Sequence, residues 1–254
     1  MAQPSSFDTR PEALALLRRE PRLALDIGCG SGGFGYGLKQ HFGSCRVWGW
    51  EQDPASAQFA RGRYDRVVET PLDQADWRAE ELQQRFDLVV LFDVLARQVD
   101  PWALLNRLHR WIEPDAHVLA GLPNVSNLPL LLDAMHGHWR YRASGLLDFR
   151  NLRFFADFDA RKMFWQCGFR VLDQEVVMRG AGKEIFERHK DDGFPLVLSV
   201  EDMSLRVETR EKLKLLCADE NLYLLEPHRG EFRNAQEKGW ATQVYPQTHV
   251  SGRD

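Results

Sequence analysis

The run from Leu23 to Gly33 constrains the fold more than any other part of this chain. It begins as an apolar strand, and Asp26 stands just before a glycine-rich turn that carries Gly28, Gly30 and Gly32. A helical pattern follows the turn. Glycine is favoured where the backbone turns with positive φ or approaches a ligand without a Cβ atom in the way. A strand, a glycine turn and a helix in this order are typical of open α/β sheets that hold a ligand at the strand's carboxyl end.

Acidic residues at three expected strand ends indicate which ligand this edge of the sheet suits. A pyrophosphate prefers backbone N–H groups without a carboxylate beside them. Asp26 therefore favours a cationic or hydroxyl-rich ligand, such as the amino acid end of S-adenosylmethionine. Glu51 ends the second strand, where a carboxylate accepts hydrogen bonds from both ribose hydroxyls; the alternative is a surface carboxylate beside a helix start. We add its neighbour Gln52 as a candidate cofactor contact. Asp93 ends the fourth strand and either points into the crevice or caps the next loop.

Strand and helix patterns alternate five times along the first half of the chain. The expected strands are 22–27, 46–50, 66–69, 86–92 and 116–122, and the helices include 34–41, 77–84 and those that begin after Asp53 and Asp100. Both aspartates precede proline, which is typical of a capped helix start. The alternation predicts an α/β fold with a Rossmann-like, doubly wound, seven-stranded, mostly parallel sheet. We expect helices on both faces and a helical insertion before the last strand.

We expect one domain over residues 1–254, a length that suits a single large α/β unit. Its expected parts are an N-terminal helix in 1–21, a cofactor-binding half in 22–125, an acceptor-side segment in 126–178, a helical insertion in 179–238 and a last strand in 239–246. A helix over 207–217 either covers the acceptor pocket or forms the contact of a homodimer.

Composition excludes several classes of protein. A net charge of −4 argues against a general nucleic-acid binder, which is usually basic. No apolar stretch is long enough for an integral membrane segment, and the N-terminus has no apolar signal core. The four cysteines lie far apart with no metal-binding spacing, so we expect no metal site, reduced thiols and a cytoplasmic location.

Four stretches resemble the class I S-adenosylmethionine-dependent methyltransferases: LALDIGCGSGGFGYGLK, VWGWEQDP, FDLVVLFDVL and DPWALLNRLHRWIEPDAHVLAGLPNV. They cover about Arg22 to Val125. A later stretch, GLLDFRNLRFFADFDARKMFWQCGFRV, resembles a subgroup found near glycosyltransferases of bacterial surface-polysaccharide synthesis. The resemblance implies O-methylation of a sugar, nucleotide-sugar or glycan precursor, with S-adenosylhomocysteine as the product. It also implies cofactor contacts at Asp26, Gly28, Gly30, Gly32, Glu51 and Asp93.

The chain departs from the subgroup at three places. Ala96-Arg97 stands where the subgroup usually has Glu-His, and Asn151 replaces the histidine of its Asp-Arg-Thr-His stretch. After the third strand the family often has Gly-Asp near the adenine, whereas this chain has Glu69-Thr70-Pro71, and Asp73 is the candidate for that role. These departures affect the assignment of a general base more than the cofactor site.

Candidates on the acceptor side lie between residues 124 and 155. Asn124 is expected to bind a substrate hydroxyl, Asp148 to accept its proton and Arg153 to orient it or hold an acidic group. The structural alternatives are that Asn124 completes a turn and that Asp148 pairs with Arg153 to fix the loop. Aromatic residues in the same segment either stack on sugar faces or form a packed lid.

Two further interpretations remain open from the sequence. One is an S-adenosylmethionine-binding regulatory or partner protein without catalysis, which the replaced Glu-His and histidine motivate. The other is a methyltransferase for another small molecule or for a protein. A nicotinamide-dependent oxidoreductase would share the sheet, but Asp26 and the glycine spacing disfavour it.

Overall fold

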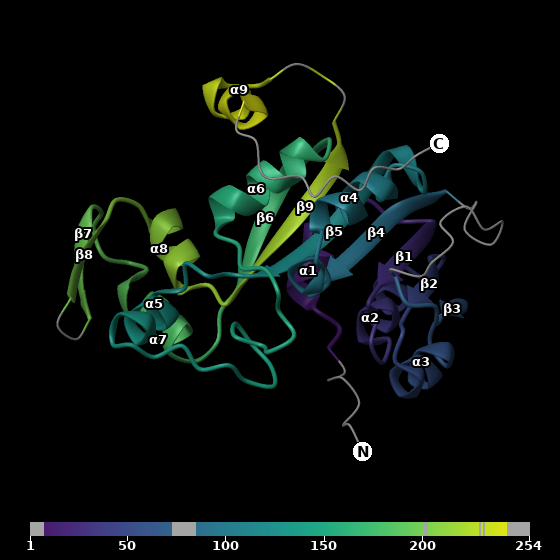
Figure 1. Cartoon of the computed structure of the whole chain (residues 1–254), viewed down its shortest axis with the longest axis horizontal. Coiled ribbons are helices and arrows are strands. Elements are labelled where there is room, and N and C mark those ends of the chain that lie inside the picture. The colour runs from purple at the N-terminus through teal and green to yellow at the C-terminus, as the bar shows by residue number, and fades with distance from the viewer. Residues whose placement is uncertain (1–7, 73–84, 201–202, 229, 231, 243–254) are drawn as a thin grey trace.

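The computed structural model describes residues 8–72, 85–200, 203–228, 230 and 232–242. A seven-stranded sheet lies at its centre and helices cover both faces (Figure 1). The helix expected over 77–84 and the candidate Asp73 lie outside the described residues.

The sheet has the expected doubly wound topology. Its strands are β1 (Leu23–Ile27), β2 (Arg46–Trp50), β3 (Arg66–Val68), β4 (Phe86–Phe92), β5 (Ile112–Pro123), β6 (Phe169–Val177) and β9 (Glu220–Pro227). They lie in the order β3-β2-β1-β4-β5-β9-β6. The first five pair in parallel, and β9 runs antiparallel to both neighbours. The chain leaves β1 toward β2 and later returns to β4 on its other side, so the order reverses between β1 and β4, where such folds bind ligands.

The helical elements up to β6 are α1 (Pro11–Leu16), α2 (Gly33–His41), α3 (Pro54–Arg61), the short η2 (Leu95–Arg97), α4 (Pro101–Leu108), α5 (Leu128–Met135) and α6 (Asp157–Gln166). The helices α1 to α4 begin where the sequence predicts them, whereas the short η2 and α5 were not predicted. The Asp53 side chain accepts a hydrogen bond from the Ser56 backbone N–H, and Asp100 accepts one from Ala103, both at 2.9 Å. These caps satisfy N–H groups that a helix start leaves without partners.

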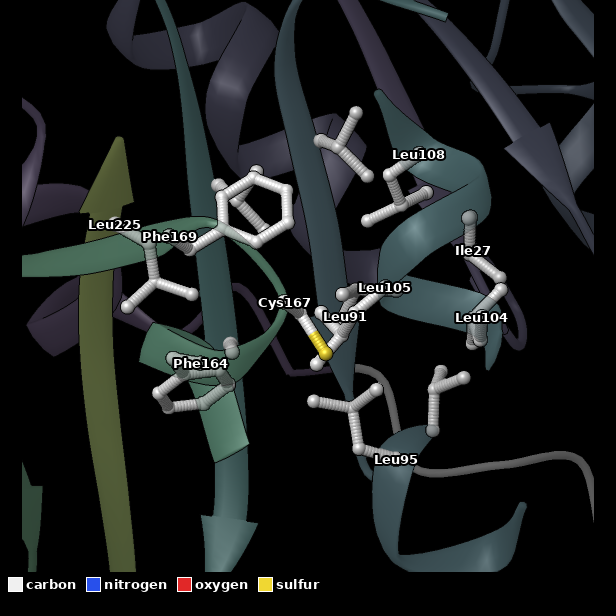
Figure 2. Close-up of a cluster of buried hydrophobic side chains, with 14 of the residues drawn as sticks. Ile27, Leu91, Leu95, Leu104, Leu105, Leu108, Phe164, Cys167, Phe169 and Leu225 are labelled. Atoms are coloured by element: carbon white, nitrogen blue, oxygen red, sulfur yellow. The ribbon is translucent and has the colours of Figure 1, made fainter. Parts of the chain in front are cut away.

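Each face of the sheet has its own hydrophobic core because side chains of a strand alternate between faces. In β4, Val89 and Leu91 belong to the cluster under α4 and α6, whereas Leu88 and Val90 belong to the cluster under α1 and α2. Figure 2 shows part of the first cluster, in which Leu105 of α4 lies beside Leu91 of β4; Leu104 and Leu108 of α4 and Phe164 of α6 belong to the same cluster. This packing fixes the strand ends that carry the candidate site.

The segment between β6 and β9 differs from the expected helical insertion. It contains α7 (Gly180–His189), the hairpin β7 (Leu196–Val200) and β8 (Met203–Val207), and α8 (Arg210–Cys217). With α5 these elements enclose a third cluster of buried apolar side chains beside the sheet (Figure 1). Each strand of the hairpin has only five residues, so its alternation of apolar and polar residues is short. Because charged helical patterns flank it, the sequence analysis assigned the whole segment to helices.

The last strand also lies elsewhere than expected over 239–246. Residues 239–242 end the helix α9 (Ala235–Thr242), and the strand that completes the sheet is β9, whose first six residues are all buried. A continuous apolar run between charged segments was the available signal for β9.

Within the described ranges, no helix is both long and apolar enough to span a membrane.

Candidate active site

The glycine turn after β1 adopts the conformation that glycine alone tolerates easily. Gly28, Gly30 and Gly32 have φ angles of 70°, 54° and 84°. A Cβ atom on Gly28 would lie 2.8 Å from Cγ2 of Val94, in the turn after β4. The turns that follow β1 and β4 therefore meet closely at the carboxyl edge of the sheet, which requires glycine here.

Glu51, the carboxylate predicted to bind the ribose, lies against this turn. Its Oε2 accepts a hydrogen bond of 2.8 Å from the Gly30 backbone N–H, and its Oε1 accepts one of 2.9 Å from Asp53. The side chain is half-buried and each oxygen keeps a further lone pair for a ligand hydroxyl. Gln52, the neighbouring candidate, is exposed.

Asp26 is buried below the turn and bound to a residue that the sequence analysis missed. The Tyr64 hydroxyl donates a 2.5 Å hydrogen bond to Asp26 and accepts one of 2.9 Å from the Gly35 backbone N–H. The Tyr64 ring fills a slot in which a Cβ on Gly35 or Gly49 would lie 1.9 Å or 2.4 Å from ring atoms. Glycine inside a helix costs about 1 kcal/mol relative to alanine. Glycines inside the helix α2 were therefore the sequence signal that another side chain, here the Tyr64 ring, packs closely against this helix.

Asp26 makes the stability of the protein depend on pH. Burial raises its pKa from 3.8 to about 7, more than the Tyr64 hydrogen bond and the charge of Arg10 lower it. The unfolded carboxyl loses its proton near pH 4, so folding takes up a proton between pH 4 and 7. The free energy of unfolding should therefore fall as pH rises through this window, by at most about 1.4 kcal/mol per pH unit from this group.

We expect Asp26→Asn to reduce this dependence because asparagine does not titrate; Glu220, whose pKa burial also raises to about 7, should account for part of the slope that remains. Urea unfolding at pH 5 and pH 7.5 measures the difference for each variant. Asp173→Asn, at an exposed carboxylate paired with Arg18, should keep the wild-type slope. An equal slope in wild type and Asp26→Asn would contradict the expectation.

Asp93 follows the last residue of β4 and pairs with Arg10, which in turn pairs with Glu220; neither Arg10 nor Glu220 was predicted. Oδ2 of Asp93 is 3.2 Å from Nη2 of Arg10, whose Nη1 donates to Glu220 Oε1 at 2.6 Å. Glu220 begins β9 and is buried, which raises its pKa to about 7 although the charge of Arg10 opposes this. The guanidinium of Arg10 also lies 4.4 Å from the centre of the Phe92 ring. These contacts join residues far apart in the sequence, and local pattern gave no signal for them.

The Asn124 side chain is hydrogen-bonded to backbone groups. Its Nδ2 donates to the carbonyls of Leu215 and Ala218 at 2.8 and 3.0 Å, and its Oδ1 accepts from the Ser126 backbone N–H at 3.1 Å. The residue is buried. Its contacts fix the insertion to the end of β5, so the expected contact with a substrate hydroxyl is not supported.

Asp148 pairs with Arg150 and Arg97, whereas the sequence analysis considered a pair with Arg153. Arg150 donates to it from Nε and from Nη2, the latter at 2.5 Å, and Nη2 of Arg97 lies at 3.3 Å. Burial alone would raise the pKa of Asp148, but these arginines hold it below its ordinary value. Arg153 instead donates to the Val99 carbonyl at 2.6 Å. Asp148 is thus a weak proton acceptor that anchors its loop.

The loop of residues 136–155 lies beside the turn after β4. The backbone N–H groups of Leu152 and Arg153 donate to the Ala96 carbonyl at 2.8 and 2.9 Å. The loop exposes the aromatic rings of Trp139, Tyr141 and Phe149. An aromatic and basic surface therefore adjoins the carboxyl edge of the sheet.

The residues at this edge fit S-adenosylmethionine. The glycine turn leaves room for close approach, Glu51 offers carboxylate oxygens for ribose hydroxyls, and Asp93 offers a partly exposed charge for a cationic group. Burial raises the pKa of Cys29 far above its ordinary value, which disfavours the thiolate form that a nucleophile needs. Across the described ranges, no group of three or more potential ligands could hold a metal ion.

Comparison with protein families matches residues 4–174 to the model described as a methyltransferase domain. A curated relative, the trans-aconitate 2-methyltransferase of Methylobacterium radiotolerans, is 33% identical over 119 residues. The match spans 46% of this chain and 45% of that relative, so the chain aligns with about half of its length.

Solved structures share the fold at low sequence identity. A protein in complex with the Trm112 methyltransferase activator of Haloferax volcanii has a TM-score of 0.56 and 19% identity, over 87% of this chain and 89% of that one. A SAM-dependent methyltransferase of Thermotoga maritima has a TM-score of 0.55 and 16% identity, over 88% of this chain and 90% of that one. The magnesium protoporphyrin IX methyltransferase of Synechocystis, solved with bound SAH, has a TM-score of 0.53 and 13% identity, over 87% of this chain and 82% of that one.

Proposed function

Because the chain belongs to the methyltransferase domain family, with S-adenosylmethionine as cofactor, we propose that it methylates a hydroxyl oxygen of a sugar, nucleotide-sugar or glycan precursor. The observation that carries this proposal is the aromatic and basic loop 136–155, bound to Ala96 beside the end of β4. Flat aromatic rings suit sugar faces, and arginines suit the phosphates or carboxylates that such precursors carry.

The chain's own residues would contribute mainly by positioning. Bound S-adenosylmethionine supplies an electrophilic methyl group. Holding an acceptor oxygen in line with it and excluding water is worth about 7–11 kcal/mol in well-oriented reactions. In this proposal Trp139 and Tyr141 stack on the acceptor, Arg153 orients its acidic group, and Asp148 keeps the loop in place through Arg150.

A second candidate is the methylation of a carboxylate. The curated relative is named for trans-aconitate, and the arginines of the loop would suit an acidic acceptor. A carboxylate is already deprotonated at neutral pH and needs no general base. This candidate is therefore compatible with the weak basicity of Asp148.

Methyl transfer from labelled S-adenosylmethionine to a panel of nucleotide sugars and small organic acids tests the proposal. Transfer to a sugar hydroxyl would support it, and transfer to carboxylates alone would support the second candidate. Binding of S-adenosylhomocysteine without transfer to any acceptor, cell extract included, would favour a regulatory protein.

We expect Trp139→Ala to raise the KM for the acceptor about tenfold, the equivalent of about 1.4 kcal/mol of lost stacking. The affinity for S-adenosylhomocysteine should not change, because the ring lies in the acceptor-side loop. Steady-state kinetics and calorimetry provide the two readouts. Phe59→Ala, at an exposed ring of α3, is the matched control and should change neither. An unchanged acceptor KM in Trp139→Ala would remove this ring from the acceptor site.

A further inference from the structure

Two residues other than glycine adopt left-handed backbone within the described ranges, and they contact each other. Arg10 has φ 48° and Asp93 has φ 57°, and their side chains form the 3.2 Å ion pair at the end of β4. Left-handed backbone is costly for residues with a Cβ atom, and such residues are enriched at binding and active sites. Their pairing therefore makes this place a candidate for ligand binding.

The guanidinium of Arg10 is held from several directions. Glu220, with 8% of its side chain exposed, accepts from Nη1 at 2.6 Å, and the Phe92 ring lies below it at 4.4 Å. The backbone N–H of Arg10 donates to the Asp8 carboxylate at 2.9 Å. Only 16% of the Arg10 side chain is exposed, so its orientation is fixed before any ligand arrives.

The segment that carries Arg10 is fitted onto the start of α2. A Cβ atom on Gly33 would lie 2.6 Å from the Asp8 carbonyl oxygen, and one on Gly37 would lie 2.9 Å from Cβ of Thr9. Residues 8–10 can lie this close to the helix because both positions are glycine. The segment therefore packs directly against the helix that follows the glycine turn.

Four carboxylates, those of Asp26, Glu51, Asp93 and Glu220, lie at the carboxyl edge of the sheet, and the guanidinium of Arg10 pairs with two of them. Two other arginines lie nearby: Arg150, whose pKa Asp93 also raises, is half exposed, and Arg63 donates to the Ser31 carbonyl at 2.6 Å. The methionine end of the cofactor is a zwitterion with an ammonium and a carboxylate. Acidic groups can bind its ammonium, but its carboxylate needs a cation or N–H donors.

We propose that Arg10 binds the methionine carboxylate of the cofactor, with Asp93, Glu220 and Phe92 holding its guanidinium in position. A guanidinium has five N–H donors, and the two ion pairs occupy two of them, so donors remain for a ligand carboxylate. The inference concerns the cofactor and does not depend on the acceptor proposed above.

The test compares two ligands that differ only in the carboxylate. S-adenosylhomocysteine carries it, whereas the decarboxylated analogue, S-(5′-adenosyl)-3-thiopropylamine, keeps the ammonium and the adenosine. We expect Arg10→Gln to lower the affinity for S-adenosylhomocysteine about tenfold to a hundredfold, the usual effect of a lost charge-assisted hydrogen bond. Calorimetry measures this affinity. The affinity for the analogue should change by less than about threefold.

The ratio of the two affinities is measured on one protein sample, so it does not depend on the folded fraction if Arg10→Gln leaves Glu220 unpaired and weakens the fold. Arg10→Lys keeps the positive charge but lacks the planar set of guanidinium donors. It should therefore lose part of the preference for S-adenosylhomocysteine over the decarboxylated analogue. Arg18→Gln, at an exposed ion pair of the following segment, should retain the wild-type ratio.

Equal weakening of both ligands in Arg10→Gln would overturn the proposal and leave Arg10 a structural role. Tighter binding of both would also overturn it, because Arg10 would then exclude the ligand's cationic end. If wild type bound neither ligand, the cofactor assignment itself would fail together with this inference.

Discussion

Gly35→Ala is expected to lower the free energy of unfolding by about 1–3 kcal/mol, the usual cost of forcing extra volume into a packed interior. The new Cβ atom would lie 1.9 Å from Cε1 of Tyr64 and 2.6 Å from its hydroxyl oxygen. Helix propensity alone predicts the opposite sign, because alanine stabilises a helix by about 1 kcal/mol relative to glycine. The sign of the change in urea unfolding therefore decides whether Tyr64 fills this slot.

Gly43→Ala is the control, because an added Cβ there has no atom within 4 Å. It should change stability by less than about 0.5 kcal/mol, as surface substitutions usually do. A double variant gives a second check. Removing the ring in Tyr64→Leu should relieve the clash, so the two changes together should cost at least about 1 kcal/mol less than their sum. Additive costs would contradict the packing described here.

The clash also bears on the site, because the Tyr64 hydroxyl holds Asp26 below the glycine turn. A ring displaced by Gly35→Ala would release that carboxylate. We therefore expect the variant to bind S-adenosylhomocysteine more weakly even at temperatures where it is fully folded.

Local pattern was sufficient to predict the cofactor half of the sheet. β4 is almost all apolar and buried on both faces, and Asp53 and Asp100 cap their helices through a contact only three residues away. Each of these features depends on neighbours in the sequence, so periodicity and capping rules reach them. The glycine turn and Glu51 were predictable for the same reason, since a known topology brings consecutive strand ends together.

The contacts that complete the site could not be predicted in this way. Tyr64 reaches Asp26 from beyond α3, and Arg10 reaches Glu220 across most of the chain. No local rule relates such residues, because tertiary packing alone brings them together. Asn124 shows the converse case, in which an asparagine at a strand end suggested a ligand contact but satisfies carbonyls of the insertion. The insertion itself was misjudged because charged helices flank its short hairpin.

Glu51→Ala is expected to weaken the binding of S-adenosylhomocysteine by about 1.5–3 kcal/mol, or about tenfold to 150-fold, because it removes charge-assisted hydrogen bonds to the ribose. Glu51→Gln keeps an acceptor oxygen for the Gly30 N–H and should lose less. Calorimetry on both variants measures the difference, and Glu113→Ala, at a surface ion pair with Arg22, should bind like wild type.

A loss in Glu51→Ala has two physical sources that can be separated. Glu51 binds the Gly30 and Asp53 N–H groups as well as the expected ribose hydroxyls, so its removal also loosens the turn. A 2′,3′-dideoxy form of S-adenosylhomocysteine lacks both hydroxyls and reports the loosening alone. If Glu51 binds the ribose, the variant should lose affinity for the natural ligand and little for the dideoxy form. Equal losses would mean that Glu51 shapes the turn without contacting the sugar, and an unchanged affinity for the natural ligand would remove it from the cofactor site.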